Sequence, residues 1–501
     1  MSGALAGALD QACVAFAHRS AVQDREERLT YQALSARAQA VADALSAAHA
    51  AADEPVVVLV GNRAADFAAF LGAWRAGCVV VPSHRSAPAP VLDGLIARCG
   101  ARFLVDCGAD AVWPVNSAAV SGSASVRSVS DVAPPSRELL RDAAFIIFTS
   151  GSTGQPKGAV VSHRAIAGKL AANDSYLHFD TDTRALLALQ ITFSFGIWVS
   201  LLTLTRGGTL FALDKFDAAS AFEAICEHRI DRVAVVPTML RAMLALVERE
   251  PERGRQLAGS GLPRQLLTGG ESLGAALSAR TQALFADAEL IDIYGLTETA
   301  TSDFVLKGED LERFSGCIGR AAPGIQYRIA AADDSIAGHG ATGELQILTP
   351  FAMNGYLDAP ELTCGAFADG YFRTGDLARE RAPGVLELVG RAKEIISRGG
   401  NKVAPLEIEQ LLLQHPEVAQ ALVTGVPDAL LGERIHALIV ARGGVQPSAQ
   451  SLRDWAAQRI EKYKLPDAFH FSAELPLGRT GKVDRGGLRA MIVSGAFEGG
   501  G

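Results

Sequence analysis

The stretch from residue 143 to residue 163, AAFIIFTSGSTGQPKGAVVSH, constrains the fold more than any other part of the chain. Residues 144–148 form an apolar run that is typical of a buried strand, and this run leads directly into a loop with three glycines. Glycine allows backbone N–H groups to approach an anion closely, and the loop adds four hydroxyls and Lys157. The segment therefore predicts a strand followed by a phosphate-binding loop, with a triphosphate as its guest.

This loop does not follow the Walker pattern, in which a Gly-Lys-Ser/Thr run opens a helix. Here Pro156 precedes Lys157 and Gly158 follows it. An ordinary P-loop NTPase is therefore not expected. A flexible surface loop of small polar residues would have a similar composition, so the interpretation depends on further motifs.

Four such motifs follow along the chain. They are IYGLTET at 293–299, GYFRTGDLA at 370–378, GRAKEIISRGGNKVAPLEIE at 390–409 and PLGRTGKVDR at 476–485. With the first loop they resemble, in content and in order, the motifs of the adenylate-forming superfamily, which contains acyl-CoA synthetases, adenylation domains of nonribosomal peptide synthetases and firefly luciferase. The resemblance implies ATP-dependent activation of a carboxylic acid to an acyl-adenylate with release of pyrophosphate, followed by transfer to a thiol.

Bulk properties exclude several other classes. The chain has 501 residues, too many for one ordinary core, and its net charge of −8 comes without a basic stripe that could neutralise a nucleic-acid backbone. Seven cysteines without a CxxC pair predict neither a disulfide framework nor a zinc site. The N-terminus does not resemble a secretory signal, and no apolar run approaches the roughly 20 residues of a membrane span. A cytoplasmic protein is expected, and the sequence leaves its oligomeric state open.

Periodicity predicts the domain organisation. Strand and helix patterns alternate between residues 56 and 106 and again between residues 232 and 295, which indicates parallel, helix-covered sheets. The segment 111–137, rich in Ser, Ala, Val and Pro, reads as an irregular connector, and short strands with turn residues after residue 316 predict a small antiparallel or barrel-like unit. The last ~110 residues read as a compact domain of their own.

We therefore expect an α/β fold with a large N-terminal domain of two helix-covered, mostly parallel sheets plus a small β-barrel-like unit, and a small mobile α+β C-terminal domain. The expected domains are residues 1–390, the AMP-binding part, and residues 391–501. In the family that the motifs resemble, the small domain rotates between two arrangements. Lys393 matches the hinge position, and a plain surface lysine is the alternative.

The resemblance also assigns roles in phosphate chemistry. Phosphoryl transfer depends mainly on positioning and on neutralising charge. The residues expected to bind the leaving pyrophosphate are Thr149, Ser150, Gly151, Ser152, Thr153, Gly154 and Lys157. The expected catalytic residues are Thr297, which bonds the α-phosphate, Glu298, which coordinates Mg²⁺, and Lys482, which bridges the carboxylate and the α-phosphate.

Further positions are implied for the nucleotide and the thiol. Tyr294 is expected to flank the adenine, and Asp376, joined by Arg391, to accept hydrogen bonds from the ribose hydroxyls. The facing loops are expected to line the nucleotide site with Gly270, Glu271 and Gly295. Gly399 and Gly400 match the segment that lines the pantetheine tunnel, and they also fit a simple hairpin turn.

The acid pocket is expected to contain Phe193, Ser194, Gly269, Gly295 and Ala300. The segment ITFSFGIW resembles the region where amino-acid-activating relatives carry an aspartate that pairs with the substrate ammonium, and Ser194 stands at that position. An α-ammonium would be buried there without a partner, which costs several kcal/mol. A non-amino acid, either aryl or short to medium aliphatic, is therefore favoured.

The thiol acceptor is less strongly indicated. GGNKVAPLEIE resembles acyl-CoA ligases, whereas FSFGIW and TGGESL resemble peptide-synthetase domains. We favour coenzyme A, with the phosphopantetheine arm of a separate carrier protein as the alternative. An oxidative enzyme of the luciferase kind and a noncatalytic nucleotide-binding protein are further alternatives, and intact Lys482, Glu298 and Asp376 argue against the latter.

Overall fold

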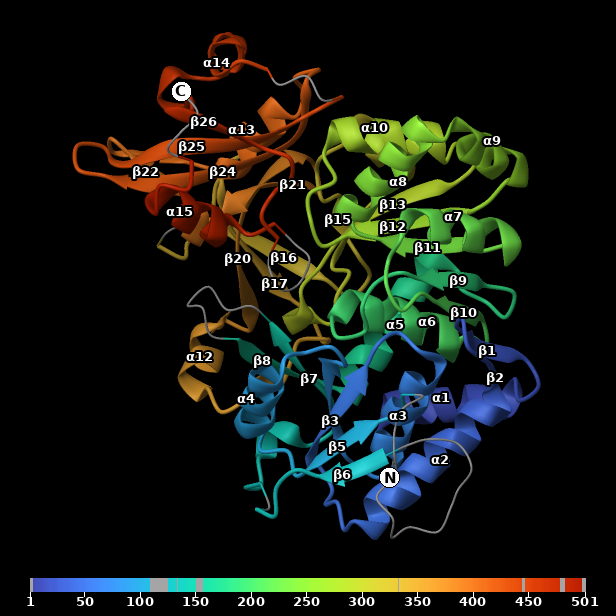
Figure 1. The fold of residues 1–501 in the computed structure, drawn as a ribbon. Helices are drawn as coiled ribbons and strands as arrows, with labels where there is room; N and C mark the ends of the chain where they lie inside the picture. The colour runs from blue at the N-terminus through green and yellow to red at the C-terminus, as the bar shows by residue number, and fades with distance from the viewer. Residues whose placement is uncertain are drawn as a thin grey trace.

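The computed structural model describes residues 3–108, 125–132, 134–149, 156–331, 333–443, 447–477 and 483–497 (Figure 1). Over these residues the chain forms two large sheets with helices between and around them, a small antiparallel sheet, and an α+β unit at the C-terminal end. This arrangement confirms the expected α/β class, its two helix-covered sheets and its small C-terminal domain.

The first large sheet has seven strands in the order β18-β8-β7-β4-β3-β5-β6, and its four strands β7, β4, β3 and β5 are parallel. The strands are β3 Pro55–Val60, β4 Val79–His84, β5 Phe103–Asp106, β6 Ser125–Ser128, β7 Ala143–Thr149, β8 Lys157–Ser162 and β18 Gly355–Tyr356. Helix α4 (Ala89–Cys99) covers one face and α3 (Ala64–Arg75) packs on the other. Covered on both faces, β3 is apolar along its whole length.

The second large sheet has nine strands in the order β15-β14-β13-β12-β11-β9-β10-β1-β2, and the run from β13 to β1 is parallel. The strands are β1 Ser20–Gln23, β2 Arg28–Thr30, β9 Arg184–Leu187, β10 Thr209–Ala212, β11 Arg232–Val235, β12 Gln265–Gly269, β13 Glu289–Tyr294, β14 Phe304–Leu306 and β15 Arg320–Ala321. The outer side carries α7 Ala218–Glu227, α8 Pro237–Arg249, α9 Pro251–Ser260, α10 Ala275–Leu284 and α11 Gly308–Arg313.

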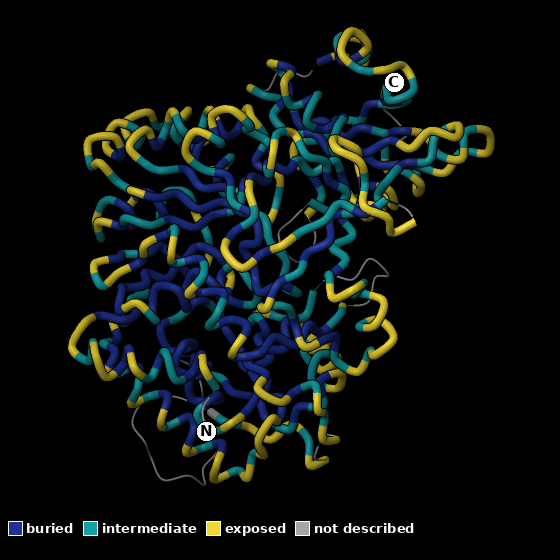
Figure 2. The backbone as a smooth tube through the Cα atoms, turned by 180° about the vertical axis from the view of Figure 1, so that it is seen from behind, coloured by how far each residue is buried: buried dark blue, intermediate teal, exposed yellow. Residues whose placement is uncertain are grey.

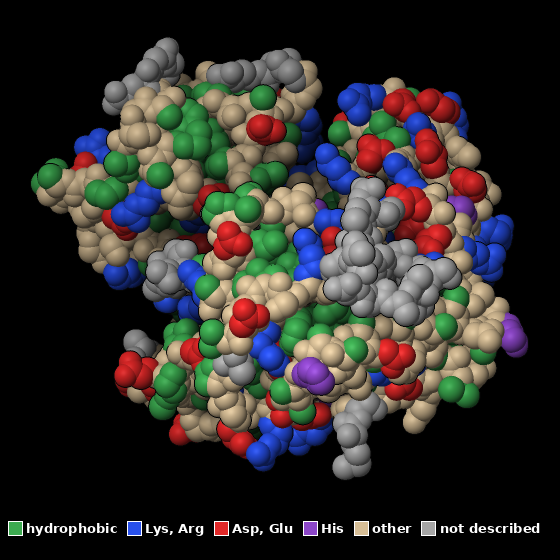
Figure 3. Space-filling model, turned by 60° about the horizontal axis from the view of Figure 1, so that its bottom comes forward, with side chains coloured by type: hydrophobic (Ala, Val, Ile, Leu, Met, Phe, Trp, Pro, Cys, Tyr) green, Lys and Arg blue, Asp and Glu red, His purple; other side chains and the backbone are tan. Residues whose placement is uncertain are grey.

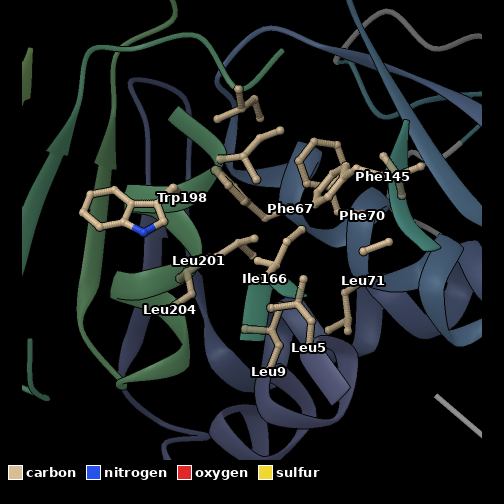
Figure 4. Packing of buried hydrophobic residues seen from close by; sticks show 14 of the residues in the cluster. Leu5, Leu9, Phe67, Phe70, Leu71, Phe145, Ile166, Trp198, Leu201 and Leu204 are labelled. Carbon is tan, nitrogen blue, oxygen red and sulfur yellow. The ribbon is translucent and has the colours of Figure 1, made fainter. Parts of the chain in front are cut away.

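Between the two sheets lies a shared layer of helices and the largest apolar core. The helices are α1 Ala4–Ala15, α2 Tyr31–Ala47, α3, α5 His163–Leu177 and α6 Ser194–Thr205. Figure 4 shows side chains from α1, α3, α5, α6 and β7 that converge in this layer, and the rings of Phe70 and Phe145 lie 5.3 Å apart. Figure 2 shows the buried backbone concentrated in the central strands and the exposed backbone at the periphery. Both sheets therefore share one core.

The remaining strands form two smaller sheets. The small antiparallel sheet consists of β16 Gln326–Ala330, β17 Gly343–Leu348, β19 Phe367–Ala368, β20 Tyr371–Ala382 and β21 Val385–Arg391, with α12 Pro360–Gly365 nearby in the chain. The C-terminal unit, orange to red in Figure 1, consists of β22 Ile396–Arg398, β23 Asn401–Val403, β24 Val418–Asp428, β25 Gly432–Ala441 and β26 Ala468–Ser472, with α13 Pro405–Leu412, α14 Ala449–Ala457 and α15 Arg485–Val493.

One local expectation was wrong. Within the segment 111–137, read as an irregular connector, residues 125–128 form β6, which pairs antiparallel with β5 at the edge of the seven-stranded sheet; residues 111–124 lie outside the described residues. Within the described part of the chain, no helix is long and apolar enough to cross a membrane. On the face shown in Figure 3, Lys and Arg side chains are interspersed with Asp and Glu.

Candidate active site

Two of the five motifs and the TGGESL segment lie at the carboxyl ends of parallel strands. Thr149 ends β7, Gly269 ends β12 and Tyr294 ends β13. In open α/β sheets ligands bind outside these ends, because the loops that follow the strands converge there. The positions of the motifs therefore mark one candidate site beside both large sheets.

The phosphate-loop motif connects two antiparallel strands. Thr149 at the end of β7 pairs directly with Lys157 at the start of β8. The loop residues Ser150, Gly151, Ser152, Thr153 and Gly154 lie outside the described residues, so their contacts with phosphate stay a prediction. The ammonium group of Lys157 lies 5.3 Å from the centre of the Tyr356 ring, a distance typical of a cation–π contact.

Tyr356 connects this lysine with the motif that follows β13. Its hydroxyl donates a 2.9 Å hydrogen bond to Oε1 of Glu298, and the backbone N–H of Met353 donates to the carbonyl of Glu298. Burial and the negative charge of Glu298 raise the pKa of the Tyr356 hydroxyl, so it remains a donor. Sequence reasoning missed Tyr356, because Gly355 and Tyr356 belong to none of the five motifs.

The same short turn also contacts the expected acid pocket. Thr297 and Glu298 belong to a 3₁₀ turn, Thr297–Thr299, and Oγ1 of Thr297 donates a 3.1 Å hydrogen bond to Oγ of Ser194. Ser194 opens α6, and Phe193 stands at its N-cap. A residue expected to contact the phosphate and a residue expected to contact the acid therefore meet at one turn.

Glycines allow the loops around this turn to pack backbone against backbone. A Cβ atom on Gly269 would clash with the carbonyl oxygen of Ile293, and one on Gly295 would clash with the backbone of Ser302. Gly270 has a φ of +84° and Ala300 a φ of +59°. Gly269, Gly270 and Gly295 therefore require glycine for local geometry, whatever they bind, and Ala300 adopts a conformation that is uncommon outside glycine.

Glu271 lies beside α8. Its carboxylate accepts hydrogen bonds of 3.1 and 3.2 Å from Oγ1 of Thr238 and lies 3.6 Å from a guanidinium nitrogen of Arg241. Burial lowers the pKa of Arg241, and the charge of Glu271 opposes this shift. Glu271 therefore has protein partners in the structure.

The residues expected at the ribose come together. Asp376 on β20 lies opposite Arg391 on β21, with 3.0 Å between Nε and Oδ1, and the Tyr294 hydroxyl donates a 2.6 Å hydrogen bond to Oδ2. Burial raises the pKa of the Asp376 carboxyl, and the positive charge of Arg391 opposes that shift. A carboxylate oxygen can accept more than one hydrogen bond, so a ribose hydroxyl can bind while these two contacts persist.

The C-terminal motifs surround the junction with the small domain. Lys393 lies in a 3₁₀ turn, Ala392–Glu394, between β21 and β22. Gly399 and Gly400 form the two-residue turn between β22 and β23, with φ values of +56° and +83°. This pair of positive φ angles is the geometry of a tight hairpin.

Lys482 lies outside the described residues, and its role stays a prediction. The last residue of its motif, Arg485, opens α15; its Nε lies 2.9 Å from Glu394, and its guanidinium also contacts Glu409 and the carbonyl of Val423. Sequence reasoning quoted Arg485 without giving it a role. Its partners lie 91 and 76 residues away, and no local pattern indicates such pairs.

Two family models match: AMP-binding enzyme over residues 9–357, and AMP-binding enzyme C-terminal domain over residues 407–482. A feruloyl-CoA synthase of Amycolatopsis sp is 32% identical over 487 residues, which cover 94% of this chain and 96% of that protein.

A fatty acid–[acyl-carrier-protein] ligase, ScoC of Streptomyces coeruleorubidus, is 30% identical over 482 residues, which cover 92% of this chain and 91% of that protein. The crystal structure of ATP-bound MatB from Rhodopseudomonas palustris superposes with a TM-score of 0.85 at 26% identity, and the match covers 98% of this chain and 99% of MatB. These similarities extend over both domains.

Proposed function

The chain belongs to the AMP-binding enzyme family, and from this premise we propose that it activates a carboxylic acid with ATP and transfers the acyl group to coenzyme A. The single observation that carries the proposal is the turn at Thr297 and Glu298. It joins Ser194 in the expected acid pocket with Tyr356 and, through Tyr356, with Lys157 beside the phosphate loop.

The first half-reaction needs no general base. The attacking oxygen belongs to a carboxylate that is ionised at neutral pH, and it bonds to the α-phosphorus as pyrophosphate leaves. The protein has to hold two anions together and stabilise the charge that develops between them. Thr297 would donate to the α-phosphate, Thr149 and Lys157 would bind the leaving pyrophosphate, and Lys482 would bridge the carboxylate and the α-phosphate.

Glu298 fits a magnesium ion. Mg²⁺ is commonly held by one or two carboxylates together with substrate phosphates and water. Oε1 of Glu298 accepts a hydrogen bond from the Tyr356 hydroxyl, which orients the carboxylate. The described residues contain no cluster of three or more metal-ligating groups, so the substrate phosphates and water would supply the remaining ligands. When bound, Mg²⁺ would neutralise phosphate charge there, and Tyr356 would keep the Glu298 carboxylate oriented toward it.

For the acid, we favour an aryl or a short to medium aliphatic acid over an α-amino acid. Ser194 has a neutral hydroxyl, which accepts a hydrogen bond from Thr297. The position therefore offers no carboxylate that could pair with a substrate ammonium. The feruloyl-CoA synthase acts on an aryl acid and ScoC on a fatty acid, and both classes fit a neutral pocket.

For the second half-reaction, the proposal divides the chain into residues 1–390 and 391–501, with a hinge near Lys393. Gly399 and Gly400 would line the path of the pantetheine thiol. The thiol attacks the acyl carbonyl, and AMP leaves. A carrier protein as acceptor is the second candidate, favoured by the FSFGIW segment and by the similarity to ScoC. A cytoplasmic location is part of the same proposal.

The test is ATP–pyrophosphate exchange with a panel of aryl, aliphatic and amino acids, followed by addition of coenzyme A to the best substrate. We expect exchange with a non-amino acid and then a CoA thioester. Exchange that is strongest with an amino acid would contradict the assigned acid class. Exchange without a CoA product would point to a carrier protein, and no exchange with any acid would overturn the proposal.

A further inference from the structure

Helix α5 carries three polar side chains on one buried face. Lys169, Asn173 and Tyr176 are spaced four and three residues apart, so they lie on the same side of the helix. Lys169 and Asn173 are fully buried, and neighbouring Ile166 and Leu170 belong to the main apolar core. A lysine is almost never fully buried unless it is paired. The partner of Lys169 therefore shows which segment of the chain this face of α5 holds.

All three side chains reach the segment that follows the Thr297–Thr299 turn. Nζ of Lys169 lies 2.6 Å from Oδ1 of Asp303, which is also fully buried, and the Thr299 hydroxyl donates to Oδ2 of the same carboxylate. The Tyr176 hydroxyl and the Ser302 hydroxyl lie 2.9 Å apart, and Nδ2 of Asn173 lies 3.5 Å from the Ser302 carbonyl.

That segment has a strained backbone. Ala300, Thr301 and Ser302 have φ values of +59°, +69° and +57°, and none of them is glycine. L-residues visit this region only occasionally and singly, and for a β-branched residue such as Thr301 it is an outlier. Such conformations persist only where the surrounding structure holds them in place.

The strained segment is continuous with the residues of the candidate active site. The backbone N–H of Thr301 donates to the carbonyl of Leu296, and that of Asp303 donates to the carbonyl of Tyr294. The chain from Tyr294 to Asp303 therefore forms a closed loop. Thr297 and Glu298 belong to this loop, whereas the polar side chains of α5 contact it from outside.

We propose that the Lys169–Asp303 ion pair is a positioning device for adenylation: it holds the left-handed segment in shape and thereby fixes Thr297 and Glu298. The inference rests on the proposed function. Lys169 touches no reacting atom, so it is a positioning residue rather than a catalytic one. A well-packed apolar pair would stabilise the core at least as well as a buried ion pair, so stability alone does not explain Lys169 and Asp303. An ion pair with hydrogen-bond geometry, in contrast, fixes the position of the loop.

The test compares two ion pairs that each contain a buried carboxylate. Lys169→Met removes the Lys169–Asp303 pair. Glu54→Gln weakens the pair of buried Glu54 with half-buried Arg102, and Glu54 directly precedes β3, at the end of the seven-stranded sheet opposite to the candidate site. Both variants are assayed for ATP–pyrophosphate exchange at a temperature where circular dichroism shows them folded. We expect about a 100-fold loss of kcat in Lys169→Met and a smaller change in KM for ATP, because small displacements of catalytic groups cost about this much. Glu54→Gln should stay within about threefold of wild type, and Lys169→Arg should recover most of the lost rate.

Tyr176→Phe is a milder second variant if Lys169→Met does not fold. It removes only the contact with Ser302, and we expect about a fivefold loss of kcat, the usual effect of one hydrogen bond. Losses below threefold in every folded variant of this face would overturn the inference. If the wild type exchanges with no acid, the proposed function fails, and the positioning role is then tested by ATP affinity measured by calorimetry. An ATP affinity about tenfold weaker in Lys169→Met and unchanged in Glu54→Gln supports the role of the Lys169–Asp303 ion pair. Equal affinities in all three proteins overturn it.

Discussion

The loop at residues 294–303 and the linker at residues 390–400 both carry motifs, but they are attached to the molecule in different ways. The loop is buried or half-buried, and α5, α6 and β18 all contribute contacts to it. In the linker, Arg391 to Lys393 and the Gly399–Gly400 turn are exposed. Its described ion pairs include that of Arg391 with Asp376, which crosses the junction, and that of Glu394 with Arg485, which lies within residues 391–501.

The apolar cores show the same difference. Four clusters of buried apolar residues contain only members before residue 390, and two contain only members after it, so no cluster of described residues spans the junction. Stabilising a developing charge needs donors that do not reorganise, which a buried, anchored loop supplies. The proposed rotation of the small domain would need an interface that is polar and easily exchanged, and the exposed linker and the separate apolar cores are consistent with it.

The largest expected effect tests whether the small domain takes part in the first half-reaction. Lys482→Ala should lower the rate of adenylate formation about 10³-fold, because the cation that offsets the repulsion between two anions is removed. Thioester formation from a supplied acyl-adenylate should be retained. Single-turnover assays of the two half-reactions measure this split, and equal loss of both steps would contradict the role of Lys482.

The next effect tests whether the small domain is stabilised independently. Arg485→Gln should destabilise it by about 3 kcal/mol, because buried Glu409 loses its charged partner. Calorimetry should then show a separate transition of lower Tm, with the unfolding of the larger domain unchanged. Arg434→Gln, which removes an exposed pair with Asp428, should cost less than about 1 kcal/mol. A single transition shifted for the whole chain would contradict the comparison.

Local sequence patterns predicted much of this architecture. Alternating apolar runs indicated the parallel sheets, and the Gly399–Gly400 pair indicated a hairpin turn, because period and turn chemistry are local properties of the chain. The strand β6 was missed because Ser-Val-Arg-Ser is short and mostly polar, and only pairing with β5 makes it a strand. Edge strands of this kind have no distinct pattern of their own.

The contacts that hold the candidate site together could not be predicted in the same way. Lys169 and Asp303 are separated by 134 residues, and Glu298 and Tyr356 by 58. A lysine in a helix is ordinarily a surface residue, and only the fold shows that this one is fully buried. Motifs therefore identified the residues expected to act on substrate, whereas the residues that position them required the structure.

A smaller effect tests the hinge. Lys393→Pro fixes φ at one residue of the linker, and a short 3₁₀ turn accepts proline's φ. We expect adenylation to be spared and thioester formation to slow about tenfold, which corresponds to about 1.4 kcal/mol. Lys393→Ala is the control for loss of the side chain alone. Unchanged overall turnover in the proline variant would reject a hinge at this position.

The smallest effect concerns the strand that leads into the buried loop. Asp292 on β13 is 8% exposed, and burial raises the pKa of its carboxyl from the ordinary value of 3.8 to about 8. Between these values the folded chain keeps the proton and the unfolded chain has released it, so this group makes stability fall as the pH rises from about 4 to about 8. Asparagine has nearly the same shape as the neutral acid and does not titrate.

Asp292→Asn should therefore be more stable than the wild type at pH 8, by at least about 1 kcal/mol or about 2 °C in Tm, and the difference should shrink toward pH 5. Thermal unfolding at several pH values measures it, with Asp93→Asn on the exposed side of α4 as the control that should show no such trend. If Asp292→Asn lost stability at pH 8 but not at pH 5, Asp292 would be ionised and bound to a partner. The strand that leads into the buried loop would then depend on a charge pair, as the loop itself does through Lys169 and Asp303.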